Sequence, residues 1–464
     1  MQDDPQTPPH LRRSLGVVHL WSIAVGMVIS GQYFGWNYGF PVAGPLGMLA
    51  AAAIVTVFYA AFIFSYAELS TSIPQADGPS GYCRRALSPF FGFLAGVAVL
   101  LEFGFAPPAI AVATGAYVHF LAPAIPAEVA TVAVFLIFIA VNLIGIAGAA
   151  LIELVATLLA LVGLALYYGA GLPHVDLAAI AGGGGEEGWI GGAGGVLAAI
   201  PYAIWLYLGV EGAAMAAEEV RDPARDIPRG FIAGILTLAG CTALTLVVTA
   251  GLGAAAGEAA DHPLPEALAA VYGASSWISR GVALIGLCGL IASLHGIVLG
   301  LSRQTFALAR AGYLPAFLSR LSRRGAPVWA VIVPGLIGVL CAGSAAFADA
   351  LIVLSVCGAL MMACLSMIAL LALRRREPAL VRPYRAPTLA LPWTALALGL
   401  FALYCVLTQS LGATALPLLG IEIPLTFVLP GILGAACLYY LVRARRRVSA
   451  LATAGRRSPA AREE

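Results

Sequence analysis

Apolar segments of about 20 residues recur along the whole chain, and they restrict its fold more than any other feature. Such a segment crosses a bilayer as a helix, which satisfies its own backbone hydrogen bonds inside lipid. Hydrophobic residues make up 61% of the sequence and charged residues 10%, a composition that no soluble domain requires. We therefore predict an all-α polytopic membrane protein with twelve transmembrane helices. The predicted spans are residues 15–43, 46–71, 89–121, 127–145, 149–171, 194–219, 229–253, 279–310, 327–345, 348–373, 391–411 and 423–442.

The positions of the arginines predict which loops face the cytoplasm. All 25 basic residues are arginines. With the amino terminus placed in the cytoplasm, they fall in inner loops and tails, and only Arg280 falls outside. This distribution follows the positive-inside rule and predicts an even number of spans in the cytoplasmic (inner) membrane, with both termini cytoplasmic. We expect residues 1–13 to be disordered, residues 443–464 to form a basic cytoplasmic tail, and no signal peptide.

The first predicted span contains an interruption at residues 28–40, VISGQYFGWNYGF. Glycines and the polar residues Ser30, Gln32 and Asn37 lie there at bilayer depth. Unwound backbone is tolerated in a membrane only where it is buried in protein or lines a polar cavity. A glycine-interrupted span is therefore typical of a transporter binding site. The alternative is a continuous helix whose small residues pack closely against a neighbouring helix.

A second interruption is predicted at residues 206–212, in the sixth span. Two halves that each open with a broken helix are typical of a 5+5 inverted repeat. The predicted repeats are about 14–171 and 194–373. Together they form a transporter core of residues 14–373, and residues 374–442 form two peripheral helices. This repeat is inferred from hydropathy and from the placement of glycines.

Two acidic residues, Glu102 and Glu211, are predicted near the middle of the membrane. Glu102 lies about twelve residues into the third span, hence about 18 Å from its end. An ionisable group at this depth is a functional hypothesis by default. Pro107 and Pro108 free two backbone carbonyls beside Glu102, which adds acceptors. Because no arginine lies at that depth, the pocket suits a small cation. The alternative for Glu102 is a protonated side chain that bonds to a neighbouring helix.

Several motifs resemble those of the amino acid–polyamine–organocation transporters, over nearly the whole chain. They are ISGQYFGW in the first span, AELSTSIPQADG after the second, WLYLGVEG with AAEEVRDPARDIPRG in and after the sixth, and FALARAGYLP after the eighth. Within this superfamily the segments GWNYGF, LLEFGFAPPAIAV and IPYAIWLYLGVEGAAMAAEEV look most like ethanolamine permeases. The resemblance implies ten core spans in two inverted repeats, with the first and sixth helices broken, plus two extra spans.

The resemblance also implies where the substrate binds, namely at the two interruptions. Relatives that carry amino acids have a Gly-Ser-Gly-like turn in the first span, whereas this chain has Ser30, Gly31 and Gln32. The bulkier Gln32 argues against carboxylate binding and favours an amino alcohol. Some relatives use a lysine in the fifth span for coupling; this chain has Ala160 near that place and no lysine, so the coupling ion, proton or sodium, stays open. The candidate residues are Ile29, Ser30, Gly31, Gln32, Glu102, Trp205, Leu206, Tyr207, Leu208 and Gly209 for substrate binding, and Glu211 and Ser293 for gating or coupling.

The sequence thus predicts a secondary active transporter that imports ethanolamine or a similar small amine by alternating access. Glu102 supplies the counter-charge in this interpretation, and Trp205 and Tyr207 close over the substrate, since aromatic faces suit cations. The alternative in the same class is an amino acid permease or exchanger, because backbone amides can hold a carboxylate.

Other function classes fit the sequence less well. A membrane sensor usually carries a soluble signalling domain, and the loops are too short for one. The chain contains no HExxH metal motif, nucleophile elbow or phosphate loop. We therefore predict no enzymatic activity, cofactor, metal site or nucleic-acid partner, and expect a small organic amine and membrane lipids as partners. The oligomeric state is left open.

Overall fold

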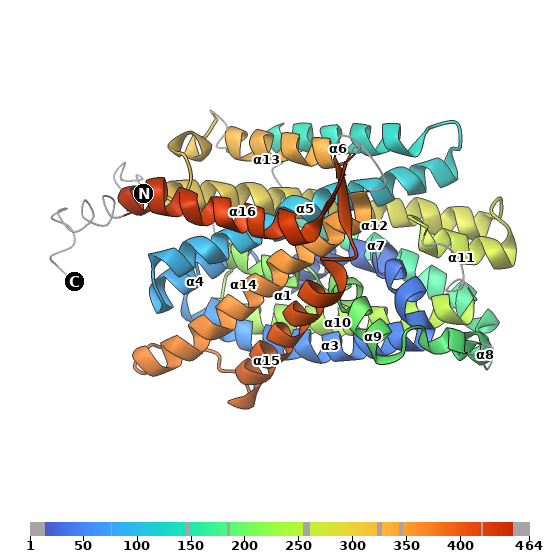
Figure 1. Ribbon diagram of the computed structural model, residues 1–464, viewed down its shortest axis with the longest axis horizontal. Helices are drawn as coiled ribbons and strands as arrows, with labels where there is room; N and C mark the ends of the chain where they lie inside the picture. The colour runs from blue at the N-terminus through green and yellow to red at the C-terminus, as the bar shows by residue number, and fades with distance from the viewer. Residues whose placement is uncertain are drawn as a thin grey trace.

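The computed structural model is a bundle of helices, many of which run along the long axis of the molecule (Figure 1). It describes residues 14–75, 77–144, 149–182, 186–253, 260–322, 327–342, 347–418 and 421–448. The predictions for residues 1–13 and for residues 449–464 of the tail therefore lie outside the described residues. The α-helices are α1 (Val17–Val28), α2 (Ser30–Tyr33), α3 (Phe40–Ser72), α4 (Gly78–Ala86), α5 (Pro89–Leu121), α6 (Ala127–Ile144), α7 (Ala149–Gly171), α8 (Leu177–Ile180), α9 (Gly192–Trp205), α10 (Pro223–Gly251), α11 (Pro263–Tyr272), α12 (Trp277–Arg310), α13 (Val328–Cys341), α14 (Ala348–Arg376), α15 (Ala390–Cys405) and α16 (Leu425–Tyr439).

Shorter elements connect or extend these helices. The 3₁₀ helices are η1 (Trp36–Gly39), η2 (Leu172–His174), η4 (Glu186–Trp189), η5 (Val210–Glu219) and η6 (Ala316–Ser319), and the π-helices are η8 (Val406–Ser410) and η9 (Tyr440–Ala444). Strands β1 (Ala415–Leu418) and β2 (Ile421–Pro424) form an antiparallel hairpin between α15 and α16, with Ala415 opposite Pro424. This hairpin is not predicted from the sequence, because two strands of four residues leave no clear alternation of polar and apolar positions.

Nine helices in the described part of the chain are long and apolar enough to cross a membrane. Three shorter apolar helices, Val17–Val28, Ala127–Leu143 and Val328–Cys341, coincide with the predicted first, fourth and ninth spans. Large apolar side chains such as Leu158 and Val162 of α7 are exposed on the outside of the bundle, where lipid would contact them. The protein is therefore an all-helical, multi-pass membrane protein, and the count of twelve spans stays a prediction.

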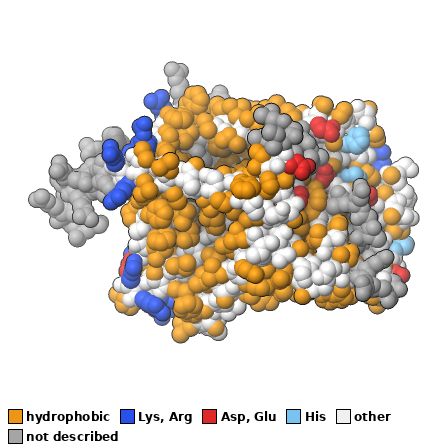
Figure 2. Space-filling view, in the orientation of Figure 1, with side chains coloured by type: hydrophobic (Ala, Val, Ile, Leu, Met, Phe, Trp, Pro, Cys, Tyr) orange, Lys and Arg blue, Asp and Glu red, His pale blue; other side chains and the backbone are white. Residues whose placement is uncertain are grey.

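The charged side chains gather at the two ends of the molecule, with a wide apolar belt between them (Figure 2). Arginines occupy one end, at the left of the view, and acidic and histidine side chains prevail at the other. This separation agrees with the loops that the positive-inside rule assigns to one side of the membrane. Which end faces the cytoplasm stays a prediction.

The chain leaves helical geometry in the first predicted span. Helix α1 ends at Val28, and α2 adds a single turn. Phe34 is then extended, with φ −164° and ψ 156°, and Gly35 has a φ of 97°. Few side-chain-bearing residues adopt this φ, so glycine suits the position. A second positive φ of 71° at Gly44 divides α3 into the end of the first predicted span and the whole of the second.

The sixth predicted span is interrupted as well. Helix α9 ends at Trp205, and residues 206–209 form a turn. Gly209 closes the turn with a φ of 95°, and η5 continues from Val210 to Glu219 as a 3₁₀ helix. The turn is shorter than the predicted interruption at residues 206–212, because the helical backbone resumes directly after Gly209.

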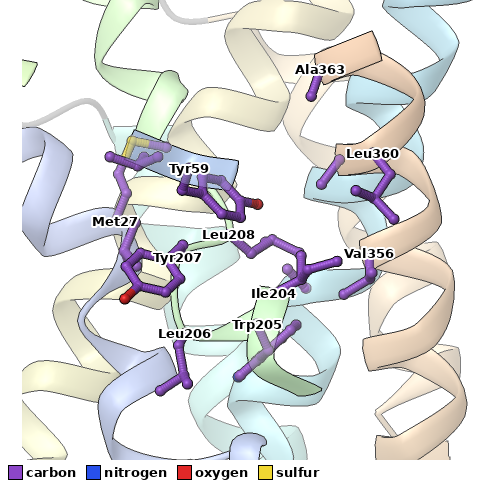
Figure 3. Close-up of a cluster of buried hydrophobic side chains, with 14 of the residues drawn as sticks. Met27, Tyr59, Ile204, Trp205, Leu206, Tyr207, Leu208, Val356, Leu360 and Ala363 are labelled. Carbon is purple, nitrogen blue, oxygen red and sulfur yellow. The ribbon is translucent and has the colours of Figure 1, made fainter. Parts of the chain in front are cut away.

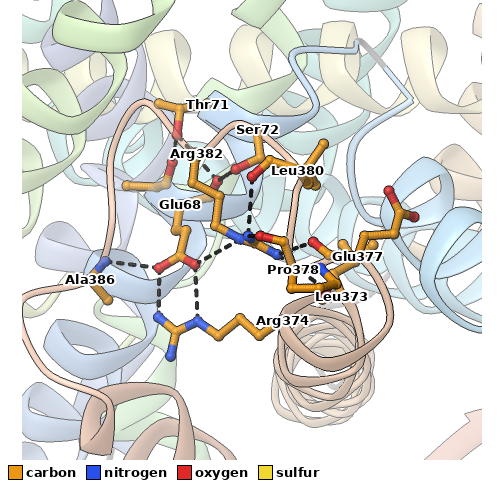
Figure 4. Close-up of polar contacts among 11 residues, drawn as sticks. Glu68, Thr71, Ser72, Leu373, Arg374, Glu377, Pro378, Leu380, Arg382 and Ala386 are labelled. Atoms are coloured by element: carbon orange, nitrogen blue, oxygen red, sulfur yellow. Dashed lines mark hydrogen bonds and ion pairs between the residues drawn. The ribbon is translucent and has the colours of Figure 1, made fainter.

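A buried ion cluster fixes the segment after α14 to the core at the arginine-rich end (Figure 4). The Glu68 carboxylate of α3 is buried, and Arg374 donates to it twice, at 3.0 and 2.6 Å. Arg382 lies 3.5 Å from the same carboxylate, and the backbone N–H of Ala386 donates to it at 2.9 Å. The three groups satisfy the charge of Glu68, so the loop that leads to α15 is held against α3 and α14. The peripheral position predicted for the two helices of residues 374–442 stays a prediction.

Candidate functional site

The two interrupted segments contact each other directly in the middle of the bundle. A Cβ atom placed on Gly31 would lie 2.5 Å from the carbonyl oxygen of Trp205, so no larger residue fits without a shift. The Trp205 indole N–H donates to the carbonyl of Phe34 at 2.8 Å. The Gln32 side-chain amide donates to the carbonyl of Leu206 at 3.0 Å. The backbone carbonyls released by one break are therefore partly satisfied by side chains from the other.

Gln32 has a structural role that the sequence analysis did not predict. Its amide nitrogen also donates to the Thr242 hydroxyl of α10 at 3.2 Å, and Thr245 of the same helix donates to its oxygen at 3.5 Å. Both amide hydrogens are thus already used inside the protein. Gln32 lies at the predicted place but positions the two breaks rather than presenting a free amide to a solute.

Ser30 and Ser293 connect the first break to α12. The two hydroxyl oxygens lie 2.7 Å apart, and the Ser293 hydroxyl donates to the backbone carbonyl of Met27. Because the proton of Ser293 is used on that carbonyl, Ser30 is the donor between the two hydroxyls. Ser293 therefore links α12 to the end of α1, so a movement of α12 would displace that end.

Tyr207 and Trp205 are packed within a cluster of buried apolar side chains (Figure 3). The Tyr207 ring stacks on Tyr59 of α3, with centroids 5.2 Å apart and an angle of 24°. Its hydroxyl is 2.6 Å from that of Thr56. Both predicted aromatic residues thus lie where the two interrupted segments meet, a place called the junction below. Both are held there by hydrogen bonds.

Glu102 and Glu211 lie beside each other, at the centre of the same junction. Their exposed fractions are 0% and 4%, and the two carboxyl groups are close enough to interact. Apart from this contact with each other and with the backbone of Gly209, their four carboxyl oxygens have no hydrogen-bond partner among the described residues. The backbone of Gly209, in the turn of the second break, lies next to the Glu102 carboxyl. The structure therefore brings both predicted acidic residues to the interrupted segments.

The surroundings of this acidic pair contain hydroxyl groups and aromatic rings. The tyrosines Tyr59 and Tyr66 of α3 interact electrostatically with both glutamates, and the Tyr66 hydroxyl is buried without a described partner. No basic group acts on the pair among the described residues. Two buried carboxylates at close range repel each other strongly unless a proton or a cation lies between them. The arrangement is thus suited to receive a proton or an ammonium group.

A third buried acid, Glu153 of α7, was missed by the sequence analysis. Its exposed fraction is 7%, and it lines a cavity of about 330 Å³ between α1, η5, α7 and α12. Ala160, which was taken as the position of interest in this span, lies two turns further along, where its carbonyl accepts from Tyr33 at 2.6 Å. The signal was present, since Glu153 is a lone acid in an apolar span. The fifth span was predicted to begin only four residues earlier, at residue 149, and the sequence analysis did not consider Glu153.

Comparison with known proteins gives a consistent family. A sequence profile described as "Amino acid permease" matches residues 15–434. An uncharacterized transporter of Rhizobium meliloti is 28% identical over 328 residues, which cover 67% of this chain and 68% of the relative. The branched-chain amino acid permease BcaP of Bacillus subtilis is 25% identical over 432 residues, covering 86% and 88%. The histidine permease of Saccharomyces cerevisiae is 25% identical over 359 residues, covering 71% and 58%.

These matches confirm the predicted superfamily. They also confirm that the protein is a transporter and not an enzyme, because permeases move solutes across membranes. They support the amino acid alternative better than the ethanolamine interpretation, since the family description and the two permeases above are named for amino acids. The profile covers nearly the whole chain, including both interrupted segments and the acidic pair. The chain therefore belongs to the amino acid permease family of the amino acid–polyamine–organocation superfamily.

Proposed function

We propose that this protein is a secondary active transporter that imports a small solute carrying a primary ammonium group, and that an amino acid is the first candidate. The observation that carries the proposal is the buried pair of Glu102 and Glu211 beside two interrupted helices, with no basic partner among the described residues. An ammonium group placed at this pair would satisfy acceptors that otherwise contact only each other and the Gly209 backbone among the described residues. The family supports the transport of an amino acid.

Ethanolamine remains a second candidate, and a specific observation favours it. An amino acid also brings a carboxylate, which needs donors such as backbone amides at a helix end. The side-chain amide of Gln32 is occupied by Leu206 and Thr242, and the nearest charges are negative. An amino alcohol with one positive charge meets no such requirement. The two substrates are therefore distinguished by whether a carboxylate on the solute helps or hinders binding.

Alternating access gives the remaining residues their proposed roles. Glu102 binds the ammonium group, while Glu211 exchanges a proton as the solute arrives and so acts as a gate or coupling residue. Ile29, Leu206 and Leu208 form the apolar wall, and the breaks allow the two halves of each span to tilt separately. Ser293 transmits movement between α12 and the first break through the Met27 carbonyl.

We propose the finer topology together with this function. The chain has twelve spans, arranged as inverted repeats of about 14–171 and 194–373 followed by two peripheral helices, and both termini lie in the cytoplasm. The nine long helices, the three shorter apolar ones and the gathering of arginines at one end support this topology. The location is then the cytoplasmic membrane of the cell.

Exchange in proteoliposomes tests the proposal. Vesicles containing the purified protein are loaded with unlabelled leucine, histidine, arginine or ethanolamine, and entry of the same labelled solute is measured. We expect exchange of at least one solute and a loss of about tenfold or more in E102Q, since the variant loses a charge-assisted contact of about 1.5–3 kcal/mol. The control variant is E128Q, at the start of α6 and away from the junction. Absence of exchange for every solute, or wild-type affinity in E102Q, would reject the proposal.

A further inference from the structure

The cavity that Glu153 lines is separate from the acidic pair and reaches the arginine-rich end of the molecule. Its outer rim contains Ser14, Glu219 and Arg303. The Arg303 and Glu219 side chains are 3.5 Å apart and partly exposed, at 42% and 23%. The backbone N–H of Ser14 donates to the carbonyl of Glu219 at 2.9 Å. Water therefore has a route from this end of the protein to the inner wall of the cavity.

Glu153 lies on the inner wall, where three helices meet. A Cβ atom on Gly26 of α1 would lie 2.2 Å from its Oε1 atom, and one on Gly296 of α12 would lie 3.5 Å away. Glycine at position 26 thus leaves the space that this carboxyl oxygen occupies. Oε1 has no hydrogen-bond partner among the described residues. A buried carboxyl oxygen without a partner is costly, so its place between α1 and α12 suggests a function.

The charged and titratable groups around the cavity leave Glu153 without a counter-ion. His295 of α12 also lines the cavity, and its ring lies 3.3 Å from the Asn142 side chain of α6. On η5 and α12, Glu219 and Arg303 face each other at the rim. From α7 itself, the Thr157 hydroxyl donates to the carbonyl of Ser22 on α1 at 3.1 Å. While the cavity is dry, this uncompensated carboxyl group is therefore stable only when it carries a proton.

The groups beside the Glu153 carboxyl favour a proton over a metal ion. Gly26, which faces Oε1, also faces the hydroxyl oxygen of Thr157, and the Met27 side chain approaches Gly296. A hard cation such as sodium is held by several oxygen ligands, as calcium and magnesium are. One carboxyl group and one hydroxyl group are fewer ligands than such a cage needs, whereas a protonated carboxyl group needs none.

The cavity also touches the interrupted segments, which provides a link to transport. Met27 and Gly212 line it, and Met27 is the residue whose carbonyl accepts from Ser293. A Cβ atom on Gly212 would meet the Met27 sulfur and methyl group, so the two breaks are in contact here. Gly26, which abuts Glu153, directly precedes Met27. A change of charge at Glu153 therefore acts on the end of α1 that leads into the first break.

We propose that Glu153 binds a proton that is released through this cavity and that thereby couples proton entry to solute import. This inference rests on the proposed transport function and adds the coupling ion to it. The proton is bound while the cavity is dry and leaves when water fills the cavity and hydrates the carboxylate. The step is a simple proton transfer from the Glu153 carboxyl group to water.

Proton movement and solute movement are measured together to test the coupling. Vesicles containing an entrapped pH-sensitive dye receive labelled leucine, with ethanolamine in a parallel series. For the wild type we expect acidification of the lumen during uptake and accumulation driven by an acidic exterior. For E153Q we expect no acidification and no accumulation above equilibrium, with exchange still measurable. The matched control is E266Q on α11, which lies outside the cavity lining and is expected to behave as the wild type.

Several results would overturn the proposal. They are proton entry in E153Q equal to that of the wild type, accumulation in the wild type that follows a sodium gradient at equal pH, or loss of exchange together with accumulation in folded E153Q. If no wild-type exchange occurs for either solute, the transport function itself fails, and the proton site is judged separately.

A labelling experiment on the wild-type protein tests the proton site by itself, and it does not depend on the folding of a variant. A hydrophobic carbodiimide reacts with protonated carboxyl groups, and mass spectrometry identifies the labelled peptide. We expect labelling of Glu153 at about pH 6 and much less at about pH 9, since a carboxyl group must hold its proton to react. Lack of labelling at the lower pH would refute a protonated Glu153.

Discussion

Replacement of Gly31 by alanine tests whether close contact of the two interrupted segments is required for transport. The new Cβ atom would lie 2.5 Å from the Trp205 carbonyl oxygen, whereas ordinary contacts begin at 3.4 Å. Because this neighbour is backbone, it cannot rotate away, and the segments must separate by about 0.9 Å. The Gln32 to Leu206 bond would then stretch from 3.0 Å to a length at which it no longer counts as a hydrogen bond.

The expected magnitude follows from these two effects. Overpacking of this kind costs about 1–3 kcal/mol, which corresponds to a change of about 5–150-fold in the population of the closed junction. We expect the exchange rate of G31A to be lower than that of the wild type by a factor in that range. We also expect its melting temperature in detergent to drop. Gly104 of α5 is the matched control, because it is a helical glycine with no neighbouring atom within 4 Å. G104A should be neutral or stabilised by up to about 1 kcal/mol. Equal exchange rates and melting temperatures in G31A and G104A would refute the reasoning.

Three further variants probe other contacts of the structure. E68Q should lower stability by about 3–5 kcal/mol, because it leaves the charge of Arg374 without its buried partner; thermal unfolding in detergent would show this, and an unchanged melting temperature would contradict it. The Arg85 guanidinium beside Glu377 lowers the pKa of that carboxyl group, so the pair stabilises the fold above the usual glutamate range and loses this effect as pH falls through the lowered value. Because both groups are well exposed, E377Q should cost less than about 1 kcal/mol at neutral pH and nothing in strong acid, which parallel melts at several pH values would check. Y207F loses the hydroxyl contact to α3 and should slow exchange several-fold with ring stacking retained; an unaffected rate would remove that hydroxyl from the closing step.

Much of the architecture follows from the sequence because membrane helices satisfy their backbones locally. Hydropathy located the long helices, and glycines marked both interruptions, since Gly35 and Gly209 adopt positive φ values that other residues avoid. The two residues of the acidic pair were also singled out, because an ionisable residue in an apolar span is costly and usually has a function. The boundaries were less predictable. The second interruption ends at Gly209 and not at Gly212, whereas the division of α3 at Gly44 falls in the predicted gap between residues 43 and 46.

What the sequence could not provide is the set of partners that each polar side chain finds across the bundle. Gln32 looked like a substrate contact, yet its amide is used by α10 and by the second break. The threonines that occupy it lie more than 200 positions away in the chain, so their contact depends on the packing of whole helices. A residue's chemistry is thus predictable from sequence, whereas its availability is decided by tertiary structure.

Glu153 shows the same principle from the opposite direction. A residue four positions after the start of α7 is expected near the membrane surface, where a carboxylate is hydrated. Packing of α7 against α1 and α12 buries Glu153 instead, and Gly26 leaves the room that its carboxyl group and the Thr157 hydroxyl need. Since a glycine also weakens a helix by about 1 kcal/mol relative to alanine, Gly26 carries a cost that the packing of these two side chains explains. G26A should therefore displace Glu153 and reduce proton-coupled accumulation as E153Q does, and normal coupling in a folded G26A protein would show that this packing serves no purpose in transport.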